Sequence, residues 1–383
     1  MKCEGPARGL IHLSMDSDVQ IDQYFSKSYA EARQFFLAAA RSAGATVESF
    51  QNPHSVPENM TLMTDVAILG PADAENVLVL ISGTHGVEGF AGSAIQVGLL
   101  RGGMTGWPKP NVRVVMIHAL NPYGFAMLRR SNEDNIDLNR NFVDHSLPYP
   151  ENHEYVKLSK AIAPLTMSGP ASALALLQVL SYWQRYGRAK LQQAVTHGQY
   201  VHPQGLFFGG RHATWSNRIL REIVERYLDR AIRMISIDVH TGLGPYGYGE
   251  VILNDSEDTP TYRRAVGWWG MERVRSTVSG KSVSAHLSGT INLAFSRMLP
   301  GTEVTAVGLE FGTVSALKVL NAMRRENWLH HHAGQNHPAT AKIKNRLLRS
   351  FYPDDDLWKR KVLEQGLLII DQALSVVDVP QSV

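Results

Sequence analysis

Cysteine is almost absent from this sequence, because Cys3 is the only one in 383 residues. One thiol cannot form an intrachain disulfide, and it excludes the metal sites that need several thiolates. Cys3 lies in a terminal stretch, where chains are usually frayed, so we do not expect it to act as a nucleophile. Any metal site in this protein must therefore be built from histidine, aspartate and glutamate.

Long apolar runs and clusters of basic residues are also lacking. No segment offers about 18 consecutive apolar residues, and the first residues do not form the apolar stretch of a signal peptide. We therefore expect a cytoplasmic protein with no membrane partner. The net charge is only +3, and lysine and arginine form no continuous stripe, so nucleic acid is not an expected partner either.

The composition is that of a folded globular protein, with 44% hydrophobic and 19% charged residues, which excludes disordered and fibrous classes. Apolar, β-branched runs alternate with segments of helical apolar spacing, which is typical of an α/β fold. Strands are predicted at residues 63–69, 77–82, 112–118, 232–239, 250–253 and 304–311. Helices are predicted at residues 28–44, 90–101, 215–230, 259–274 and 314–329. Residues 145–205 interrupt this rhythm, so we expect one domain over residues 1–383 with an insertion there.

The first candidate site lies in residues 82–89, Ser-Gly-Thr-His-Gly-Val-Glu-Gly, directly after a predicted buried strand. Ligands of open α/β sheets bind at such carboxyl ends of strands. The i, i+3 spacing of His85 and Glu88 lets one turn point an imidazole and a carboxylate at the same cation. The pair alone is a weak signal, because a solvated or helix-capping pair has the same spacing.

A polar loop at residues 130–142 follows the next predicted strand. Asparagine and aspartate favour turns for local reasons, so by one interpretation the loop is only a solvated connection. By the other interpretation, Arg130 and Arg140 supply fixed positive charge, one for a substrate carboxylate and one for a developing oxyanion.

Two later strands each carry one polar residue of interest. His240 comes at the carboxyl end of a predicted apolar strand, although a lone histidine at such a place is more often structural. Glu310 lies inside an apolar strand, where the burial of an unpaired carboxylate costs several kcal/mol. Glu310 therefore needs a cation, a hydrogen-bond donor or a proton.

Together and in this order, the four clusters resemble the zinc carboxypeptidase family and its relatives that deacylate N-acyl amino acids. Residues 137–142, Asp-Leu-Asn-Arg-Asn-Phe, match a segment of that family letter for letter. The segments Gly-Thr-His-Gly-Val-Glu-Gly and Asp-Val-His-Thr-Gly-Leu-Gly resemble a bacterial branch of it. The resemblance covers about residues 75–315 and implies a three-layer α/β/α sandwich around a mostly parallel mixed sheet.

The resemblance also implies a metal and a base. His85, Glu88 and His240 would bind one zinc ion per chain and leave a fourth position for water. Glu310 would act as the general base that takes a proton from this water and later gives it to the leaving amine.

Three polar residues of the loop would handle the substrate. Arg130 would polarise the scissile carbonyl, while Asn139 and Arg140 would hold a terminal carboxylate. The implied function is hydrolysis of an amide bond next to a free carboxylate in a small peptide. Two alternatives stay open: an N-acyl amino acid deacylase of the aspartoacylase or succinylglutamate desuccinylase type, and a binding protein that keeps the pocket without turnover.

Three further features have less support from the sequence. Residues 280–302 lack the mobile tyrosine of the carboxypeptidases, for which Tyr246 and Tyr248 offer either a substitute or a plain exposed turn. The Gly-x-Gly-x-x-Gly pattern of residues 242–247 precedes a predicted strand instead of the helix that dinucleotide binding requires. The three histidines of residues 330–332 end a predicted helix, where a cationic helix terminus explains them as well as a metal does.

Overall fold

The structure, a computed structural model, describes residues 21–54, 56, 60–102, 109–334 and 336–377, and Cys3 lies outside them. The described residues form one sheet with the strand order β1-β2-β4-β3-β5-β8-β6-β7. In chain order the strands are β1 (Thr46–Gln51), β2 (Met63–Leu69), β3 (Asn76–Ile81), β4 (Val112–His118), β5 (Arg233–Tyr246), β6 (Gly249–Leu253), β7 (Val274–Ser276) and β8 (Glu303–Gly312).

The four strands at the centre of the sheet, β4, β3, β5 and β8, are parallel to one another. The pairs β1–β2, β2–β4 and β6–β8 are antiparallel, whereas β7 pairs with β6 in parallel. β3 is buried along its whole length, as its continuous apolar run predicts for a strand covered on both faces. Because the central strands are parallel, their carboxyl ends meet at one edge of the sheet.

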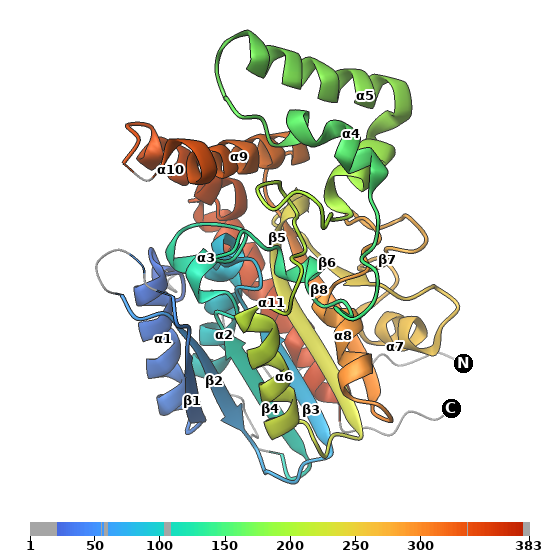
Figure 1. Cartoon of the computed structure of the whole chain (residues 1–383). Helices are drawn as coiled ribbons and strands as arrows, with labels where there is room; N and C mark the ends of the chain where they lie inside the picture. Colours follow the sequence, from blue (N-terminus) through green and yellow to red (C-terminus); the bar gives the residue numbers. More distant parts are fainter. Residues whose placement is uncertain (1–20, 55, 57–59, 103–108, 335, 378–383) are drawn as a thin grey trace.

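Helices cover both faces of this sheet (Figure 1). One face packs against α1 (Tyr29–Ser42), α2 (Gly89–Arg101), α7 (Pro260–Trp269) and α11 (Asp356–Val376), and their apolar residues form the largest cluster of the core. The opposite face packs against α6 (Trp215–Tyr227) and α8 (Ile291–Met298) in a second cluster. The predicted three-layer α/β/α arrangement is therefore confirmed.

A third group of helices lies beyond the carboxyl ends of the central strands, at the top of Figure 1. It consists of α4 (His153–Ile162), α5 (Gly169–Thr196), α9 (Ala316–Trp328) and α10 (Thr340–Phe351), whose apolar residues form a cluster of their own. α4 and α5 come from residues 145–205, so this part of the chain stands over the sheet edge where ligands of such folds bind. Within the described ranges, none of the helices combines the length and the apolar character that a membrane span requires.

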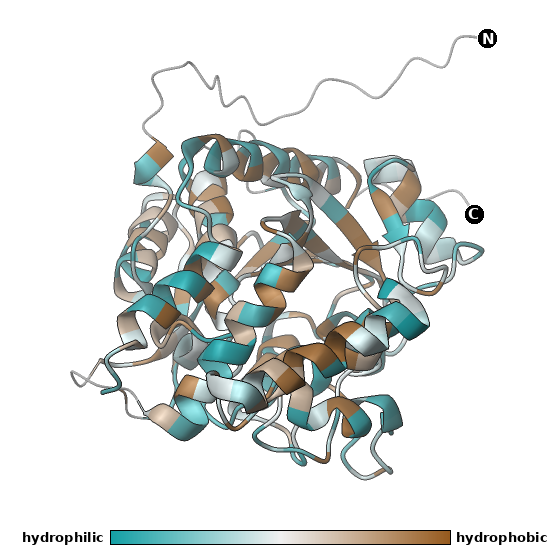
Figure 2. Cartoon of the chain, turned by 90° about the horizontal axis from the view of Figure 1, so that it is seen from above, coloured by the Kyte–Doolittle hydropathy of each residue, from teal (hydrophilic) through white to brown (hydrophobic). Residues whose placement is uncertain are grey.

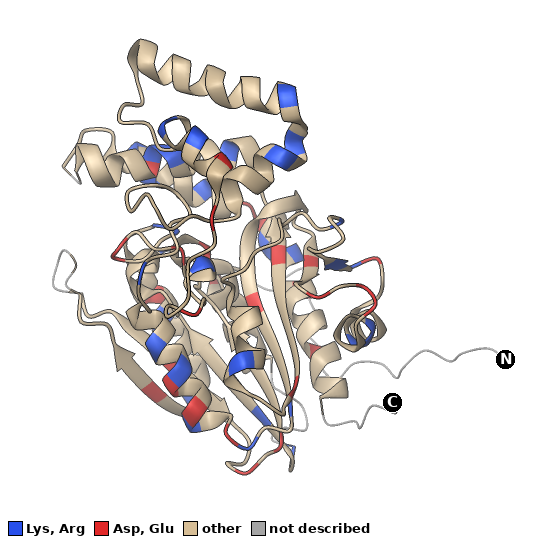
Figure 3. Ribbon diagram, turned by 45° about the vertical axis from the view of Figure 1, so that its right-hand side comes forward, with Lys and Arg blue, Asp and Glu red and all other residues tan. Residues whose placement is uncertain are grey.

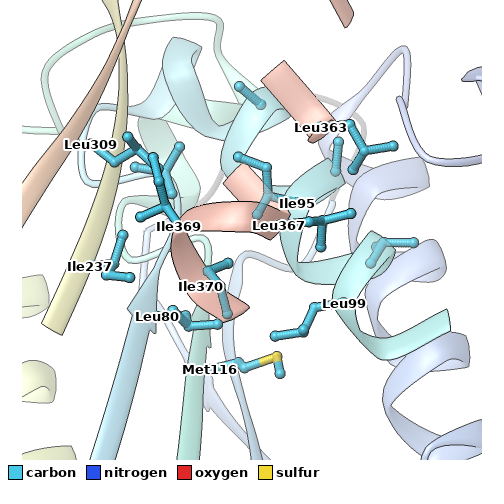
Figure 4. Packing of buried hydrophobic residues seen from close by; sticks show 14 of the residues in the cluster. Leu80, Ile95, Leu99, Met116, Ile237, Leu309, Leu363, Leu367, Ile369 and Ile370 are labelled. Atoms are coloured by element: carbon cyan, nitrogen blue, oxygen red, sulfur yellow. The ribbon is translucent and has the colours of Figure 1, made fainter. Parts of the chain in front are cut away.

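The contact between α2 and α11 shows how the sequence sets the packing of one layer (Figure 4). Gly98 of α2 and Gly366 of α11 lie at points of close approach. An added Cβ would come within 2.7 Å of Leu363 at the first position and within 2.5 Å of Ile95 at the second. A larger residue at either position would force Leu363 or Ile95 to move, and the burial of each large apolar side chain between the helices contributes about 1.5–3 kcal/mol.

One predicted helix is too long, and one strand was not predicted. The helix predicted at residues 259–274 ends at Trp269, because Gly270 takes a φ of +84°, which no α-helix continues. The residues after it form the edge strand β7 instead. β1 is a strand that the sequence does not predict, and its side chains are mostly exposed or half-buried, so it carries little apolar pattern.

His118, at the end of β4, gives the free energy of unfolding an expected dependence on pH. Its ring is fully buried, stacks on Phe36 with centroids 4.5 Å apart, and has Nε2 3.0 Å from Ser93 Oγ. Burial lowers the pKa of His118 from 6.5 to about 4, against a smaller opposite effect of Asp65. The native state therefore holds a neutral ring, whereas the unfolded chain binds a proton below about pH 6.5.

We expect His118 to contribute stability that is fully present above about pH 6.5 and that falls by about 3 kcal/mol as the pH drops toward 4. Urea unfolding of the wild type and of His118→Gln, at about pH 7.5 and about pH 4.5, measures this part as the difference between their pH dependences. If the free energy of unfolding changed equally with pH in the two proteins, a group other than His118 would be the source of the change.

Candidate metal centre

The turn after β3 holds the first two predicted metal ligands. His85 precedes a single turn of 3₁₀-helix, η3 (Gly86–Glu88), which leads directly into α2. The N–H of Gly86 donates to the carbonyl oxygen of Arg130 at 3.2 Å, so the turn is held against the polar loop of the second candidate cluster. Only glycine fits at this position, because a Cβ would lie 1.9 Å from the backbone of Gly124.

The third predicted ligand, His240, is delivered by β5. Asp238 is in register with Ile81, the last residue of β3, so His240 lies two residues beyond that end and beside the turn. The sequence predicts that this strand ends at residue 239. In the structure β5 continues to Tyr246, because its last residues still pair with β8 after a register shift. The long strand therefore fixes His240 within a hydrogen-bonded ladder.

The three predicted ligands meet at one point. Nδ1 of His85 is 3.1 Å from Oε1 of Glu88, and Nδ1 of His240 is 3.0 Å from Oε2 of the same carboxylate. Their candidate ligand atoms all lie within 4.8 Å of one another, and all three residues are buried. Although Nδ1 of His85 lies close to Glu88, it makes no hydrogen bond to Glu88 or to any other described residue, which fits a ligand atom that faces a cation. Two imidazoles and one carboxylate suit zinc, and they also occur around other first-row metals.

Two further carboxylates orient the histidines. Oδ1 of Asp137 is 3.1 Å from Nε2 of His85, and Oδ2 of Asp238 is 2.8 Å from Nε2 of His240. Each carboxylate favours the tautomer with a proton on Nε2 and leaves Nδ1 free for a metal. Thr84 in turn donates to Asp238 Oδ1 at 2.8 Å. Sequence reasoning did not select either aspartate, although Asp238 stands two residues before His240 and so shares its face of the strand.

The charges of this cluster stabilise one another. Burial by itself would raise the pKa of Glu88, but His85 and Arg130 hold it well below its usual range. Burial would also raise the pKa of Asp137, but nearby cations, Arg130 above all, hold it well below its usual value. For His240, burial would lower the pKa, but Asp238 and Glu88 raise it well above its ordinary value. The carboxylates of the site thus favour positive charge at the two imidazoles.

Arg130 forms ion pairs with the candidate ligand Glu88 and with Asp137. Its Nη1 donates to Glu88 Oε1 at 2.7 Å and its Nε to Asp137 Oδ2 at 3.0 Å. Its Nη2 makes no hydrogen bond among the described residues. The ring of Phe207 lies 5.5 Å from this guanidinium and 5.6 Å from that of Arg140, so one ring supports both arginines. Phe207, which the sequence did not single out, has a φ of +55°, a conformation that is costly for an aromatic residue.

Asn139 and Arg140, predicted to hold a substrate carboxylate, already have protein partners. Asn139 Oδ1 accepts a hydrogen bond from the N–H of Ile291 at 3.0 Å, and its Nδ2 lies 3.2 Å from Nε2 of His240. Arg140 donates from Nε to the carbonyl oxygen of Thr196 at 3.0 Å, from Nη2 to the same oxygen, and from Nη1 to the carbonyl oxygen of Asn139. One N–H on each terminal nitrogen of Arg140 is left for a ligand.

Glu310 lies opposite His240 in the ladder between β5 and β8. It is half-buried rather than enclosed, and Oε1 accepts a hydrogen bond from the N–H of Leu243 at 2.8 Å, which is the donor that the sequence argument required. Burial, and then the charge of Glu88, raise the pKa of Glu310 to about 7. A carboxyl group that exchanges its proton near neutral pH is suited to act as a general base.

Most of these side chains line one cavity of about 800 Å³, which lies between the sheet edge, α5 and α9, whereas Glu88, Asp137 and Asp238 lie behind its wall. Its size is within the range of small-molecule sites. α5 and the loop at residues 277–290 meet above it, where Gln192 Nε2 donates to the carbonyl oxygen of Val283 at 2.6 Å. Nδ1 of His197 also lies 3.1 Å from the carbonyl oxygen of His286. Residues 145–205 therefore cover part of the cavity.

The remaining sequence features contribute no catalytic group to this cavity, although residues 242–245 of the glycine-rich pattern line it. The hydroxyl of Tyr246 donates to Asp355 at 2.5 Å and that of Tyr248 to the carbonyl oxygen of Glu272 at 3.1 Å, so neither tyrosine covers the site. The glycine-rich pattern leads into β6, as predicted, and not into a helix. The histidines of residues 330–332 belong to a π-helical turn after α9.

A family model described as Protein of unknown function (DUF2817) matches residues 25–365. The chain belongs to this family. A comparison of this DUF2817 protein with the curated proteins found no match.

Three solved structures illustrate what the DUF2817 protein is similar to. Thrombin-activatable fibrinolysis inhibitor is 13% identical, with a TM-score of 0.50, over 94% of this chain and 77% of the other. Carboxypeptidase A from Helicoverpa armigera is 12% identical, with a TM-score of 0.47, over 87% and 76% of the two chains. Succinylglutamate desuccinylase/aspartoacylase from Rhodobacter sphaeroides is 16% identical, with a TM-score of 0.36, over 77% and 68%. The first of these matches shows a shared fold, and the predicted carboxypeptidase-like α/β architecture is confirmed.

Proposed function

We propose that this DUF2817 protein is a zinc-dependent hydrolase that cleaves an amide bond next to a free carboxylate. One observation carries the proposal. His85, Glu88 and His240 form a buried group that could hold a metal ion. His85 and His240 line the same cavity as Glu310, whose pKa is raised to about 7 and which is not one of these candidate ligands. A metal centre beside a separate base is the arrangement that hydrolysis by activated water requires.

The residues around the metal have distinct tasks in this reaction. Zinc bound there would supply a Lewis acid that lowers the pKa of a water molecule and polarises the scissile carbonyl. Glu310 takes the proton from this water and returns it to the leaving amine. The N–H of Leu243 holds Oε1 of Glu310, and Oε2 has no hydrogen bond among the described residues, so Oε2 is available for the proton.

The arginines handle the negative charges of the substrate. Nη2 of Arg130 is available to donate to the oxygen on which charge develops as water attacks the carbonyl. Arg140, with Asn139 beside it, offers its remaining N–H groups to the substrate carboxylate. Phe207 and the carbonyl oxygen of Thr196 hold the Arg140 side chain in place, so little conformational entropy is lost when a ligand binds.

An N-acyl amino acid is the second candidate substrate, beside a small peptide. The contact between α5 and the loop at residues 277–290 covers the cavity, and a covered cavity accepts a small acylated amino acid more readily than a peptide chain. The reaction and the roles of the residues are the same for both substrates. The two differ only in what lies on the acyl side of the scissile bond.

Metal analysis combined with a substrate screen tests the proposal. We expect purified protein to hold about one zinc ion per chain, and the zinc-loaded protein to hydrolyse members of a panel of dipeptides and N-acyl amino acids, with loss of activity on chelation. Stoichiometric zinc without turnover of any compound would favour the binding-protein alternative. Protein that takes up no zinc would contradict the metal site itself.

A further inference from the structure

The side of the cavity opposite the metal centre is mainly apolar. α9 contributes only apolar residues to it, among them Leu320 and Met323. α5 contributes Trp183, Leu191 and Val195, with the polar residues Arg188, Gln192 and Thr196 between or beside them. Aliphatic and aromatic side chains offer no partner to a polar group, so a polar substituent placed there would lose its hydrogen bonds to water without compensation. An apolar substituent would instead be removed from water, and the flexible thioether of methionine adapts to its shape.

We propose that this side binds the acyl chain of an N-acyl amino acid whose acyl group is of medium or long chain length. The proposal rests on the hydrolase function proposed above and names its substrate class. The amide bond then lies at the metal centre, the amino acid carboxylate lies near the arginines, and the acyl chain extends between α5 and α9.

The length of the apolar side favours an acyl chain over a single amino acid side chain. Its α5 residues extend from Val195 to Trp183, on both sides of Gly187, where a φ of +83° interrupts the helix. Val195 directly precedes Thr196, whose carbonyl oxygen holds Arg140, whereas Trp183 is 42% exposed at the surface. The apolar side thus runs from the site to the outside of the molecule, and Figure 2 shows apolar residues along α5 in the view from above.

The charges around the cavity indicate the nature of the other end of the ligand. Apart from the metal-binding set and Glu310, its ionised lining residues are Arg130, Arg140 and Arg188. All three are cations, and Arg130 and Arg140 lie beside the candidate metal ligands, so this end of the cavity favours an anion such as the carboxylate of an amino acid. Arg188 directly follows the interruption of α5, between Trp183 and Leu191, and Figure 3 shows basic residues gathered around this interruption. One anionic end and one extended apolar end together describe an N-acyl amino acid.

A series of substrates that differ only in chain length tests this assignment. We compare kcat/KM of the zinc-loaded protein for N-acetyl-, N-hexanoyl- and N-decanoyl-alanine. Each methylene group removed from water strengthens binding roughly threefold to fourfold, so kcat/KM should rise by on the order of 100-fold or more from acetyl to decanoyl. Equal values, or a preference for acetyl, would overturn the substrate class and leave the hydrolase proposal standing.

Calorimetric titration of the metal-free protein with the same three compounds gives a readout without turnover. Tighter binding of the decanoyl than of the acetyl compound supports the apolar site, even if none of the three is hydrolysed and the hydrolase proposal fails. Binding that does not depend on chain length would overturn the inference, whatever the activity shows.

Two variants on α5 locate the binding surface. Trp183→Ala should reduce the ratio of decanoyl to acetyl kcat/KM about tenfold, because the ring forms the outer part of the apolar side. Leu177→Ala is the matched control, since Leu177 is 60% exposed on the same helix but does not line the cavity. An unchanged ratio in Trp183→Ala, or an equal change in both variants, would overturn the placement of the chain along α5.

Discussion

Glu310→Gln is expected to lower the kcat of amide hydrolysis by about 10²–10⁴-fold while zinc stays bound. Glutamine keeps the size of the side chain and an oxygen that can accept the hydrogen bond from Leu243, but it cannot take a proton from water. The candidate metal ligands do not include Glu310, so the affinity for zinc should be retained. The measurement is kcat on the best substrate of the screen, with the zinc content determined in the same samples.

Glu303→Gln is the matched control for this experiment. Glu303 lies at the other end of the same strand, where it is partly exposed and pairs with Arg233 at 2.8 Å. Loss of a partly exposed ion pair costs little stability, and kcat should not change. A zinc-replete Glu310→Gln protein with full activity would remove Glu310 as the general base.

His240→Ala is expected to abolish stoichiometric zinc binding and hydrolysis together, whereas Asp238→Asn should weaken zinc binding by about 10–100-fold. The alanine variant removes one of the three candidate ligands among the described residues. The asparagine variant keeps the ligand but replaces the carboxylate that faces its Nε2 at 2.8 Å, so the imidazole becomes a weaker and less well oriented donor. Competition with a chelator of known affinity ranks the three proteins.

The control for the zinc measurements is His153→Ala. His153 is exposed on α4, so its loss removes one histidine without touching the cavity. Circular dichroism shows whether each variant is folded, which separates loss of a ligand from loss of structure. Wild-type zinc affinity in folded His240→Ala would contradict the metal set, and unchanged affinity in Asp238→Asn would contradict the orienting role of the carboxylate.

The sequence predicts most strands inside the sheet well because each is a run of apolar residues that the fold buries on both faces, although β5 continues to Tyr246, beyond its predicted end. β2 and β4 have the predicted bounds. The edge strands β1 and β7 escape prediction, since β1 buries little of its surface and β7 has only three residues. α7 is shorter than its apolar spacing predicts because the φ of Gly270 ends it, and a sequence pattern gives no dihedral angle.

The candidate metal ligands are also within reach of the sequence, because His85 and Glu88 follow β3 and His240 lies in the adjacent parallel strand β5, just beyond the end of β3. What the sequence does not provide are the contacts between distant segments. Asp137 lies beside His85 only because of the way its loop folds, and the sequence does not show this. Arg140 is held by the carbonyl oxygen of Thr196, at the end of α5, and no local pattern predicts where α5 packs. Sequence reasoning therefore finds chemical groups more readily than the partners that position them.

The packing of α11 against α2 has a consequence for how this protein is made. Leu363, Leu367 and Ile370 complete the largest apolar cluster, which also contains residues of α2 and of the central strands that are synthesised far earlier. Until the ribosome has released α11, the apolar surface that it covers remains in contact with water. The growing chain therefore passes through a long aggregation-prone stage, in which chaperones bind exposed apolar segments. We therefore expect a chain that ends before residue 356 to aggregate more than the full chain, even though it contains every proposed catalytic residue.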